Sequence, residues 1–216
     1  MHNTVKNLIY IEELIKSKAN HDELAKIIAV SKTFPIENIL PLIEHGHLHF
    51  GENKVQEALD KWSDMKIKND AIKLHLIGRL QTNKVKFALR IFDYIHSLDG
   101  EKLATKISEE QVKQEKRPKI FIQVNIGNED QKSGINKDNL AYFYKFCKNL
   151  DLDIIGTMCI PPNDGNAEKY FSEMNKINQE LNFKELSMGM SEDYLEAIKN
   201  NATYVRVGSK IFGSRS

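Results

Sequence analysis

The chain has 216 residues, and its 31 lysine and arginine residues against 30 aspartate and glutamate residues give a formal net charge of +1. That length suits one large domain or two small ones, and the balanced charge gives no reason to expect a nucleic acid or an anionic membrane surface as partner. The two cysteines, Cys147 and Cys159, are too few for a disulfide framework and indicate a reduced, cytoplasmic protein.

Segments with strand character alternate with segments of helical spacing along the whole chain. An apolar stripe over residues 5–15 predicts an opening amphipathic helix, and the lysine and glutamate residues within it exclude a signal-peptide core or a membrane span. Strands are expected at residues 24–30, 47–50, 73–77, 92–97, 119–126, 152–160, 185–190 and 202–207. Helices are expected between them, at residues 36–43, 55–62, 82–90, 103–112, 140–147, 167–181 and 191–200.

This alternation predicts a parallel sheet, because parallel strands need crossover connections that are usually helical. Eight such units in a chain of this size favour a closed (β/α)8 barrel, formed as a single domain over residues 1–216, over an open doubly wound sheet. No GxGxxG or Walker-type loop follows a strand, which argues against a dinucleotide or a nucleoside triphosphate as ligand.

A barrel gathers the residues that follow its strands at one face, where barrel proteins place their active sites. Lys32 follows the first strand, in the segment IAVSKTFP. The segment SMGMS comes at the end of the seventh strand, and Gly208 and Ser209 follow the eighth. Small residues, hydroxyls and backbone amides suit a phosphate dianion, and Ser191 is expected at a helix start, where an anion is favoured.

A lysine across the barrel mouth from a phosphate site indicates a Schiff base to a phosphorylated aldehyde. Two ligands stay open on this reasoning, an aldolase substrate and pyridoxal phosphate (PLP) held as an internal aldimine. Arg206, near the end of the eighth strand, could contact the ring nitrogen of PLP. A guanidinium stays charged and has no acceptor, so it would discourage protonation of that nitrogen.

The same residues have ordinary structural interpretations. A lysine at a strand end is usually solvated, Arg206 could be an ion-pair residue, and Asn53 could cap the helix that follows it. The segment HGHLH could bring alternate histidines to a metal ion. Gly46 instead predicts the end of a helix, which places His45 and His47 in a turn, and we therefore expect no metal site.

Seven segments resemble the YggS/PROSC family of pyridoxal-phosphate homeostasis proteins, which is itself similar to the barrel domain of alanine racemase. These segments are AVSKTFP, HFGENKVQEA, LHLIGRLQTNK, NIGNEDQKSGI, GTMCIPP, LSMGMSEDYLEAI and RVGSKIFGSR. The resemblance implies that Lys32 forms the internal aldimine with PLP. It also implies a cofactor site made by Asn53, Ser187, Met190, Ser191, Arg206, Gly208 and Ser209. Arg79 stands where the family usually has proline.

Two functions fit such a site, an enzyme acting at the α-carbon of amino acids and a carrier that holds, buffers and delivers PLP. Racemisation by two bases needs an acid–base group on each face of the substrate. Lys32 can serve one face, and the sequence offers no room for the second domain that supplies the other base in alanine racemase. We therefore expect a monomeric, cytoplasmic PLP homeostasis protein without robust catalysis and without a catalytic residue. Its expected partners are PLP and apo PLP-dependent enzymes as recipients, with neither nucleic acid nor membrane.

Overall fold

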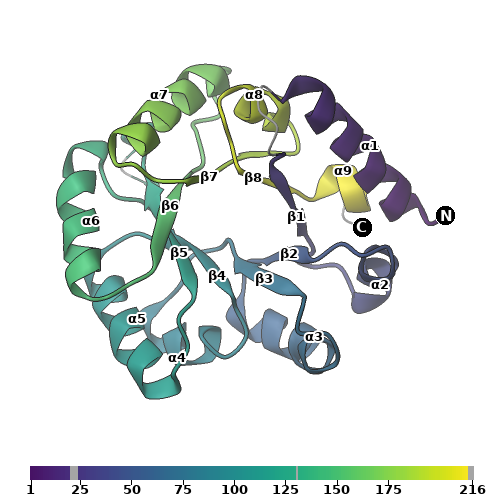
Figure 1. Ribbon diagram of the computed structural model, residues 1–216, viewed down its shortest axis with the longest axis horizontal. Helices are drawn as coiled ribbons and strands as arrows, with labels where there is room; N and C mark the ends of the chain where they lie inside the picture. The colour runs from purple at the N-terminus through teal and green to yellow at the C-terminus, as the bar shows by residue number, and fades with distance from the viewer. Residues whose placement is uncertain (20–23, 130, 214–216) are drawn as a thin grey trace.

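The computed structural model describes residues 1–19, 24–129 and 131–213. Its strands pair in chain order, each parallel to the next, and β8 pairs with β1 to close the sheet. Figure 1 looks down this ring of strands and shows the helices arranged around its outside. The predicted (β/α)8 barrel is therefore confirmed.

The elements follow one another in the alternation that the sequence predicts. The strands are β1 (Lys26–Val30), β2 (His49–Glu52), β3 (Lys73–Leu76), β4 (Tyr94–Leu98), β5 (Lys119–Val124), β6 (Ile154–Cys159), β7 (Glu185–Met190) and β8 (Tyr204–Val207). The helices are α1 (Asn3–Lys18), α2 (Ile36–Glu44), α3 (Val55–Lys68), α4 (Val85–Ala88), α5 (Glu101–Gln114), α6 (Leu140–Asn149), α7 (Ala167–Glu180), α8 (Tyr194–Lys199) and α9 (Ser209–Phe212). Two short 3₁₀ segments are η1 (Thr82–Lys84) and η2 (Lys137–Asn139).

Two layers of side chains hold the barrel together. Between helices and strands, the apolar stripes of the helices join the outer faces of the strands in one large core. Helix α1, for example, buries Leu8, Ile11 and Ile15 from its predicted stripe. Inside the ring of strands lies a separate cluster made by Ile28, Tyr94, Phe121, Met158 and Tyr204. The barrel interior is thus filled by side chains, and ligands are confined to its ends.

Among the boundaries that differ from the sequence prediction, two bear on the site. Strand β2 covers His49–Glu52 rather than residues 47–50, because Gly51 and Glu52 continue the pairing with β3. Helix α8 begins at Tyr194, so Ser191 lies in the turn before it and not at a helix start.

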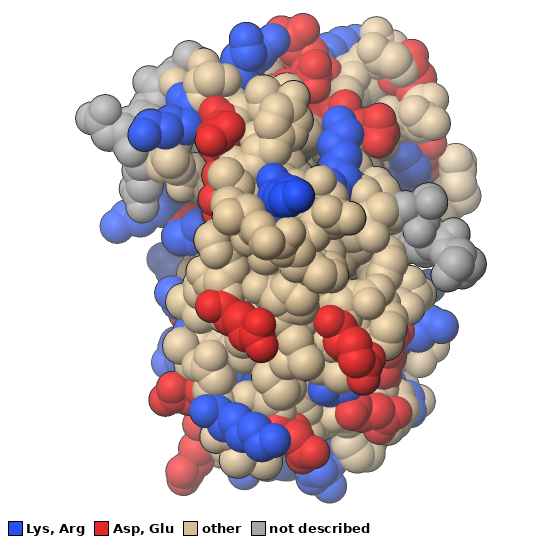
Figure 2. All heavy atoms as spheres, turned by 90° about the vertical axis from the view of Figure 1, so that its right-hand side faces the viewer, with Lys and Arg blue, Asp and Glu red and all other residues tan. Residues whose placement is uncertain are grey.

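The turn after α2 forms as predicted. Gly46 has φ +95° and its amide donates to the carbonyl of Ile43, while the amide of His47 donates to the carbonyl of Leu42. A left-handed glycine with these two bonds is a common helix ending. On the face of the molecule that carries α1 and α2, basic and acidic side chains are interspersed (Figure 2), in keeping with the balanced charge.

Among the described residues, no helix has both the length and the apolar character needed to cross a lipid bilayer.

Candidate functional site

A cavity of about 880 Å³ lies at the carboxyl ends of the strands. Its walls come from residues at or after the ends of β1, β2, β3, β5, β6, β7 and β8. All of the predicted site residues except Ser187 line it, namely Lys32, Asn53, Met190, Ser191, Arg206, Gly208 and Ser209. The parallel barrel thus brings together segments that are up to 177 residues apart, counted from Lys32 to Ser209.

The two segments predicted to bind phosphate lie side by side. The amide of Gly208 donates to Ser191 Oγ over 3.3 Å, which joins the turn after β7 to the end of β8. The same turn also holds a carboxylate, because Asp193 Oδ1 accepts a 2.6 Å hydrogen bond from the amide of Met190. An anion at this place would compete with Asp193 for that amide.

Arg206 lines the cavity although it is buried. Its Nη1 donates to Ser187 Oγ over 2.8 Å and its Nη2 donates to the carbonyl of Cys159 over 2.9 Å. Burial lowers the pKa of the guanidinium, and nearby Cys159 and Asp193 partly offset this; arginine nevertheless stays charged in proteins. No ion pair to Arg206 occurs within the described part of the chain, so its buried charge is held by neutral acceptors.

Ser187 departs from its predicted place. It is fully buried, does not line the cavity, and lies between Arg206 and the ring of His96, whose Nδ1 is 2.9 Å from Ser187 Oγ. The sequence placed Ser187 beside the phosphate because it belongs to the segment SMGMS. The strand continues to Met190, however, and Ser187 points into the barrel from its middle. Ser187 is therefore a support for Arg206.

Asn53 lines the cavity and does not cap α3. The residue at the cap position is Lys54, and no side chain makes a capping bond there. The backbone of Asn53 is in close contact with the next loop, since a Cβ atom on Gly78 would lie 2.4 Å from the carbonyl oxygen of Asn53. Glycine at position 78 thus allows the segments after β2 and β3 to meet at the mouth of the barrel.

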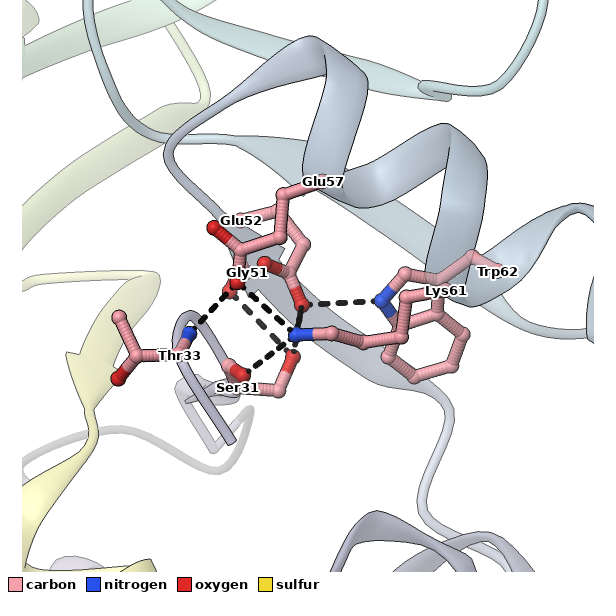
Figure 3. Close-up of polar contacts among 7 residues, drawn as sticks. All are labelled: Ser31, Thr33, Gly51, Glu52, Glu57, Lys61 and Trp62. Atoms are coloured by element: carbon pink, nitrogen blue, oxygen red, sulfur yellow. Dashed lines mark hydrogen bonds and ion pairs between the residues drawn. The ribbon is translucent and has the colours of Figure 1, made fainter. Parts of the chain in front are cut away.

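The segment that carries Lys32 is held on both sides by a cluster of polar side chains, which Figure 3 shows. Before the lysine, Ser31 Oγ donates to Glu52 Oε1 over 2.7 Å, and Lys61 Nζ donates to the carbonyl of Ser31 over 2.9 Å. After the lysine, the amide of Thr33 donates to Glu57 Oε1 over 2.6 Å. Thr33 has φ +69°, a strained conformation for a β-branched residue. We call Ser31, Thr33, Glu52, Glu57, Lys61 and Trp62 the Lys32 clamp.

Glu52 is the centre of the Lys32 clamp. Its Oε1 accepts from Ser31, from Lys61 over 3.0 Å and from the indole of Trp62 over 2.9 Å, and its side chain is 0% exposed. Burial raises the pKa of the neighbouring Glu57 carboxyl, but hydrogen bonds from Thr33 and Lys61 outweigh it and hold that pKa below its ordinary value. Two carboxylates and one ammonium therefore fix the backbone on either side of Lys32.

Sequence reasoning missed this cluster. Glu52 was assigned to a loop, where a carboxylate would be solvated, although Glu57, Lys61 and Trp62 follow it at helical spacing. The i, i+4 spacing of Glu57 and Lys61 is the signal that could have found this part of the clamp, because it puts these two side chains on one face of α3.

The histidines of HGHLH do not converge on one point. His45 is exposed, His47 Nε2 is 2.9 Å from the carbonyl of His49, and His49 Nδ1 is 2.9 Å from His75 Nε2. In the described ranges, no group of three or more histidine, cysteine, aspartate or glutamate side chains is arranged to hold a metal ion.

The closed barrel and the arrangement at its mouth define a class of protein. A lysine at the end of β1, hydroxyls and amides after β7 and β8, and a buried guanidinium on β8 surround one cavity. In agreement, residues 11–216 match the family described as alanine racemase, N-terminal domain. The protein is thus a barrel of the alanine-racemase type.

Within that class, the curated relatives identify a particular family. The chain is 36% identical to the pyridoxal phosphate homeostasis protein of Pasteurella multocida, over 95% of this chain and 93% of the relative. It is 31% identical to the protein of the same name from Escherichia coli K12, over 100% of this chain and 98% of the relative. The chain belongs to the family of pyridoxal phosphate homeostasis proteins.

Solved structures agree with this assignment. PipY of Synechococcus elongatus PCC7942, solved with PLP bound, is 31% identical with a TM-score of 0.86, covering 97% of this chain and 100% of PipY. Alanine racemase of Clostridium difficile 630 shares the fold, with 15% identity and a TM-score of 0.71, and the chain covers 57% of that enzyme.

Proposed function

We propose that this protein binds PLP at the barrel mouth and acts in PLP homeostasis, holding the cofactor through a Schiff base on Lys32. The observation that carries the proposal is the shared cavity. An amine, a pair of phosphate-binding segments and a buried guanidinium surround about 880 Å³, which is ample space for one cofactor. The names of the curated relatives and the PLP-bound structure of PipY support the same ligand.

The residues present fit the three polar parts of PLP. Ser191, Ser209, Gly208, Lys32 and Arg206 all line the cavity. We propose that Ser191, Ser209 and the amide of Gly208 bind the phosphate, that Lys32 binds the aldehyde, and that Arg206 faces the ring nitrogen. Two backbone amides beside the proposed phosphate already have acceptors: the amide of Gly208 donates to Ser191 Oγ, and the amide of Met190 donates to the Asp193 carboxylate. We therefore propose that the phosphate displaces Asp193 from that amide.

Arg206 also bears on the choice between carrier and enzyme. PLP supplies an electron sink for amino-acid chemistry, and this sink is strongest when the ring nitrogen is protonated. A buried guanidinium donates hydrogen bonds and has no acceptor, so Arg206 works against that protonation. This feature, with the names of the relatives, supports holding and delivering PLP as the main role. Racemase-like turnover is the second candidate, favoured only by the shared fold.

The central test is the position of the covalent bond. The protein is loaded with PLP, reduced with borohydride and digested, and the peptide that carries the added mass is identified. We expect the label on Lys32, loss of the label in Lys32→Arg, and no loss in Lys132→Arg, a lysine that lines the same cavity. Label on another lysine would refute the assignment.

Turnover is tested separately, with a panel of L- and D-amino acids and the loaded protein. We expect no sustained racemisation above that of free PLP, and sustained turnover that is lost in Lys32→Arg would make the protein an enzyme.

We further propose that the chain forms one domain, is a monomer in the cytoplasm and transfers PLP to apo PLP-dependent enzymes. The two cysteines support a reducing compartment, since both are buried as free thiols. Light scattering gives the oligomeric state. Transfer is checked by mixing the loaded protein with an apo-enzyme, whose activity should return faster than with an equal amount of free PLP in the presence of a PLP scavenger.

A further inference from the structure

Three histidines form a continuous chain through the inside of the barrel. They come from successive strands, His49 from β2, His75 from β3 and His96 from β4. His49 Nδ1 lies 2.9 Å from His75 Nε2, and His75 Nδ1 lies 2.9 Å from His96 Nε2. His96 Nδ1 is in turn 2.9 Å from Ser187 Oγ, the hydroxyl that accepts from Arg206.

The two inner rings are sealed from water. His75 and His96 are fully buried, His75 is stacked on Tyr94 with ring centroids 4.2 Å apart, and His96 is stacked on Phe121 at 4.3 Å. Burial is the main cause that holds the pKa of both rings well below the ordinary value of histidine; the neighbouring histidines add to it for His75, and Arg206 adds to it for His96. Both rings are therefore neutral at pH 7, each with one N–H and one bare nitrogen.

A neutral chain of this kind has only two self-consistent arrangements. Either every ring carries its proton on Nε2 and Ser187 donates to His96, or every ring carries it on Nδ1 and His96 donates to Ser187. Mixed arrangements would set two donors or two bare nitrogens face to face at 2.9 Å.

Arg206 distinguishes the two arrangements. Its guanidinium only donates, so Ser187 Oγ is an acceptor toward Arg206 in both. Among the described residues, His96 Nδ1 is the one acceptor within reach of the Ser187 hydroxyl proton. If His96 donated to Ser187, that hydroxyl proton would be buried without a partner, which is costly. The arrangement with all three protons on Nε2 leaves no such group.

The other end of the chain is open. His49 is half-buried and lines a cavity of about 530 Å³ at the amino-terminal ends of the strands, on the opposite side of the barrel from the PLP site. Because the His49 side chain is only partly buried, water can accept the last proton of the chain.

We propose that His49, His75 and His96 are positioning residues for Arg206. In the arrangement with all protons on Nε2, the chain holds the Ser187 hydroxyl turned toward His96, so that a lone pair of Ser187 Oγ faces the guanidinium. The chain thereby fixes the orientation in which Arg206 meets the ring of the ligand. The identity of this ligand as PLP rests on the proposed function. The positions of the protons on the three histidine rings do not depend on it.

The first measurement uses the full-length, ¹⁵N-labelled protein without added PLP. Long-range ¹H–¹⁵N spectra of histidine rings distinguish Nδ1–H from Nε2–H forms and from the imidazolium. We expect neutral His75 and His96 rings at pH 7, both with the proton on Nε2. A proton on Nδ1 of either ring, or an imidazolium, overturns the proposal.

Variants at His49 test whether the rings act as one chain. His49→Phe removes the acceptor of the His75 Nε2 proton, so we expect both His75 and His96 to shift toward the Nδ1–H form. His49→Asn keeps an acceptor oxygen and should restore the Nε2–H form, and His45→Gln, at the same cavity, should change neither ring. If His49→Phe does not fold, His49→Leu takes its place. An unchanged His96 ring in the folded variant overturns the proposal, because independent rings would not respond at this distance.

The last measurement tests whether the three histidines affect the ligand site. In protein loaded with PLP, we expect His49→Phe to shift the absorbance spectrum of the bound cofactor, and His49→Asn and His45→Gln to leave it unchanged. An identical spectrum in all variants overturns the positioning role. If the wild-type protein does not bind PLP at all, the proposed function fails. The histidine spectra of the unloaded protein still decide which nitrogen of each ring carries the proton.

Discussion

Replacing Lys61 with methionine tests the Lys32 clamp most directly. Lys61 Nζ donates to the Ser31 carbonyl, to Glu52 Oε1 and to Glu57 Oε1, over 2.9, 3.0 and 3.2 Å. Methionine keeps most of the aliphatic length and removes all three bonds. The Glu52 carboxylate then stays buried with only the neutral donors of Ser31 and Trp62.

The expected loss of stability follows from the burial of this pair. The side chain of Glu52 is 0% exposed and that of Lys61 is 10% exposed. Removing one partner of a buried ion pair costs about 3–5 kcal/mol, and the more exposed contact with Glu57 adds less than about 1 kcal/mol. A total near 4 kcal/mol would be a large part of the roughly 5–15 kcal/mol that stabilises an ordinary domain. We also expect weaker PLP retention, since the backbone beside Lys32 loses the hydrogen bond from Lys61 to the Ser31 carbonyl.

The assay is urea unfolding followed by tryptophan fluorescence, with Lys106→Met as the control. Lys106 is 34% exposed, against 10% for Lys61, and pairs with Glu109 and Glu110 on α5, so its replacement should cost much less than that of Lys61. The double variant Lys61→Met, Glu52→Gln should recover much of the loss, because it leaves no buried charge unpaired. A loss below about 1 kcal/mol in Lys61→Met, at an unchanged slope of free energy against urea, would show that the clamp does not depend on the ion pair.

Three further predictions concern other buried groups. Arg206→Met should weaken PLP retention and shift the spectrum of the bound cofactor; unchanged values of both would contradict a contact with the ring nitrogen. Burial lowers the pKa of His47 from 6.5 to about 4, so the unfolded chain binds a proton first as the pH falls. The contribution of neutral His47 to the free energy of unfolding is therefore complete above pH 6.5. It is lost between pH 6.5 and 4, at about 1.4 kcal/mol per pH unit. His47→Gln should flatten the pH dependence of the free energy of unfolding by that slope, and an equally steep curve would refute the assignment. Burial raises the pKa of the Cys147 and Cys159 thiols to about 12. A thiol reagent at pH 8 should therefore modify neither cysteine until urea unfolds the protein, and rapid modification of the native protein would be inconsistent with this burial.

Much of the site could be predicted from the sequence because a parallel barrel sorts residues by their place along the strand. Lys32, Ser191, Arg206 and Ser209 all lie at or just after the carboxyl ends of strands, and such ends share one face of the barrel. The alternation of strands and helices was enough to bring these residues to one cavity. The resemblance to a family then added the identity of the ligand, which the residues alone had left open between PLP and an aldolase substrate.

The direction of a side chain was less predictable than its place in the chain. Ser187 was expected beside the phosphate, and the structure turns it into the barrel against His96. Glu52 was expected in a loop, and the two additional residues of β2 place its side chain outside the barrel, against Trp62. Successive residues of a strand point to opposite faces, so a boundary error of one or two residues is enough to lose such a contact.

The sequence by itself determined the barrel, the face that holds the site and the lysine at its centre, because these depend on local periodicity and on strand order. Only the tertiary structure decided which polar groups meet inside. Whether His49, His75 and His96 form a chain depends on the register between neighbouring strands, which places each histidine two residues beyond the register partner of the previous one. That register results from the packing of all eight strands together, and no short segment of the sequence contains it.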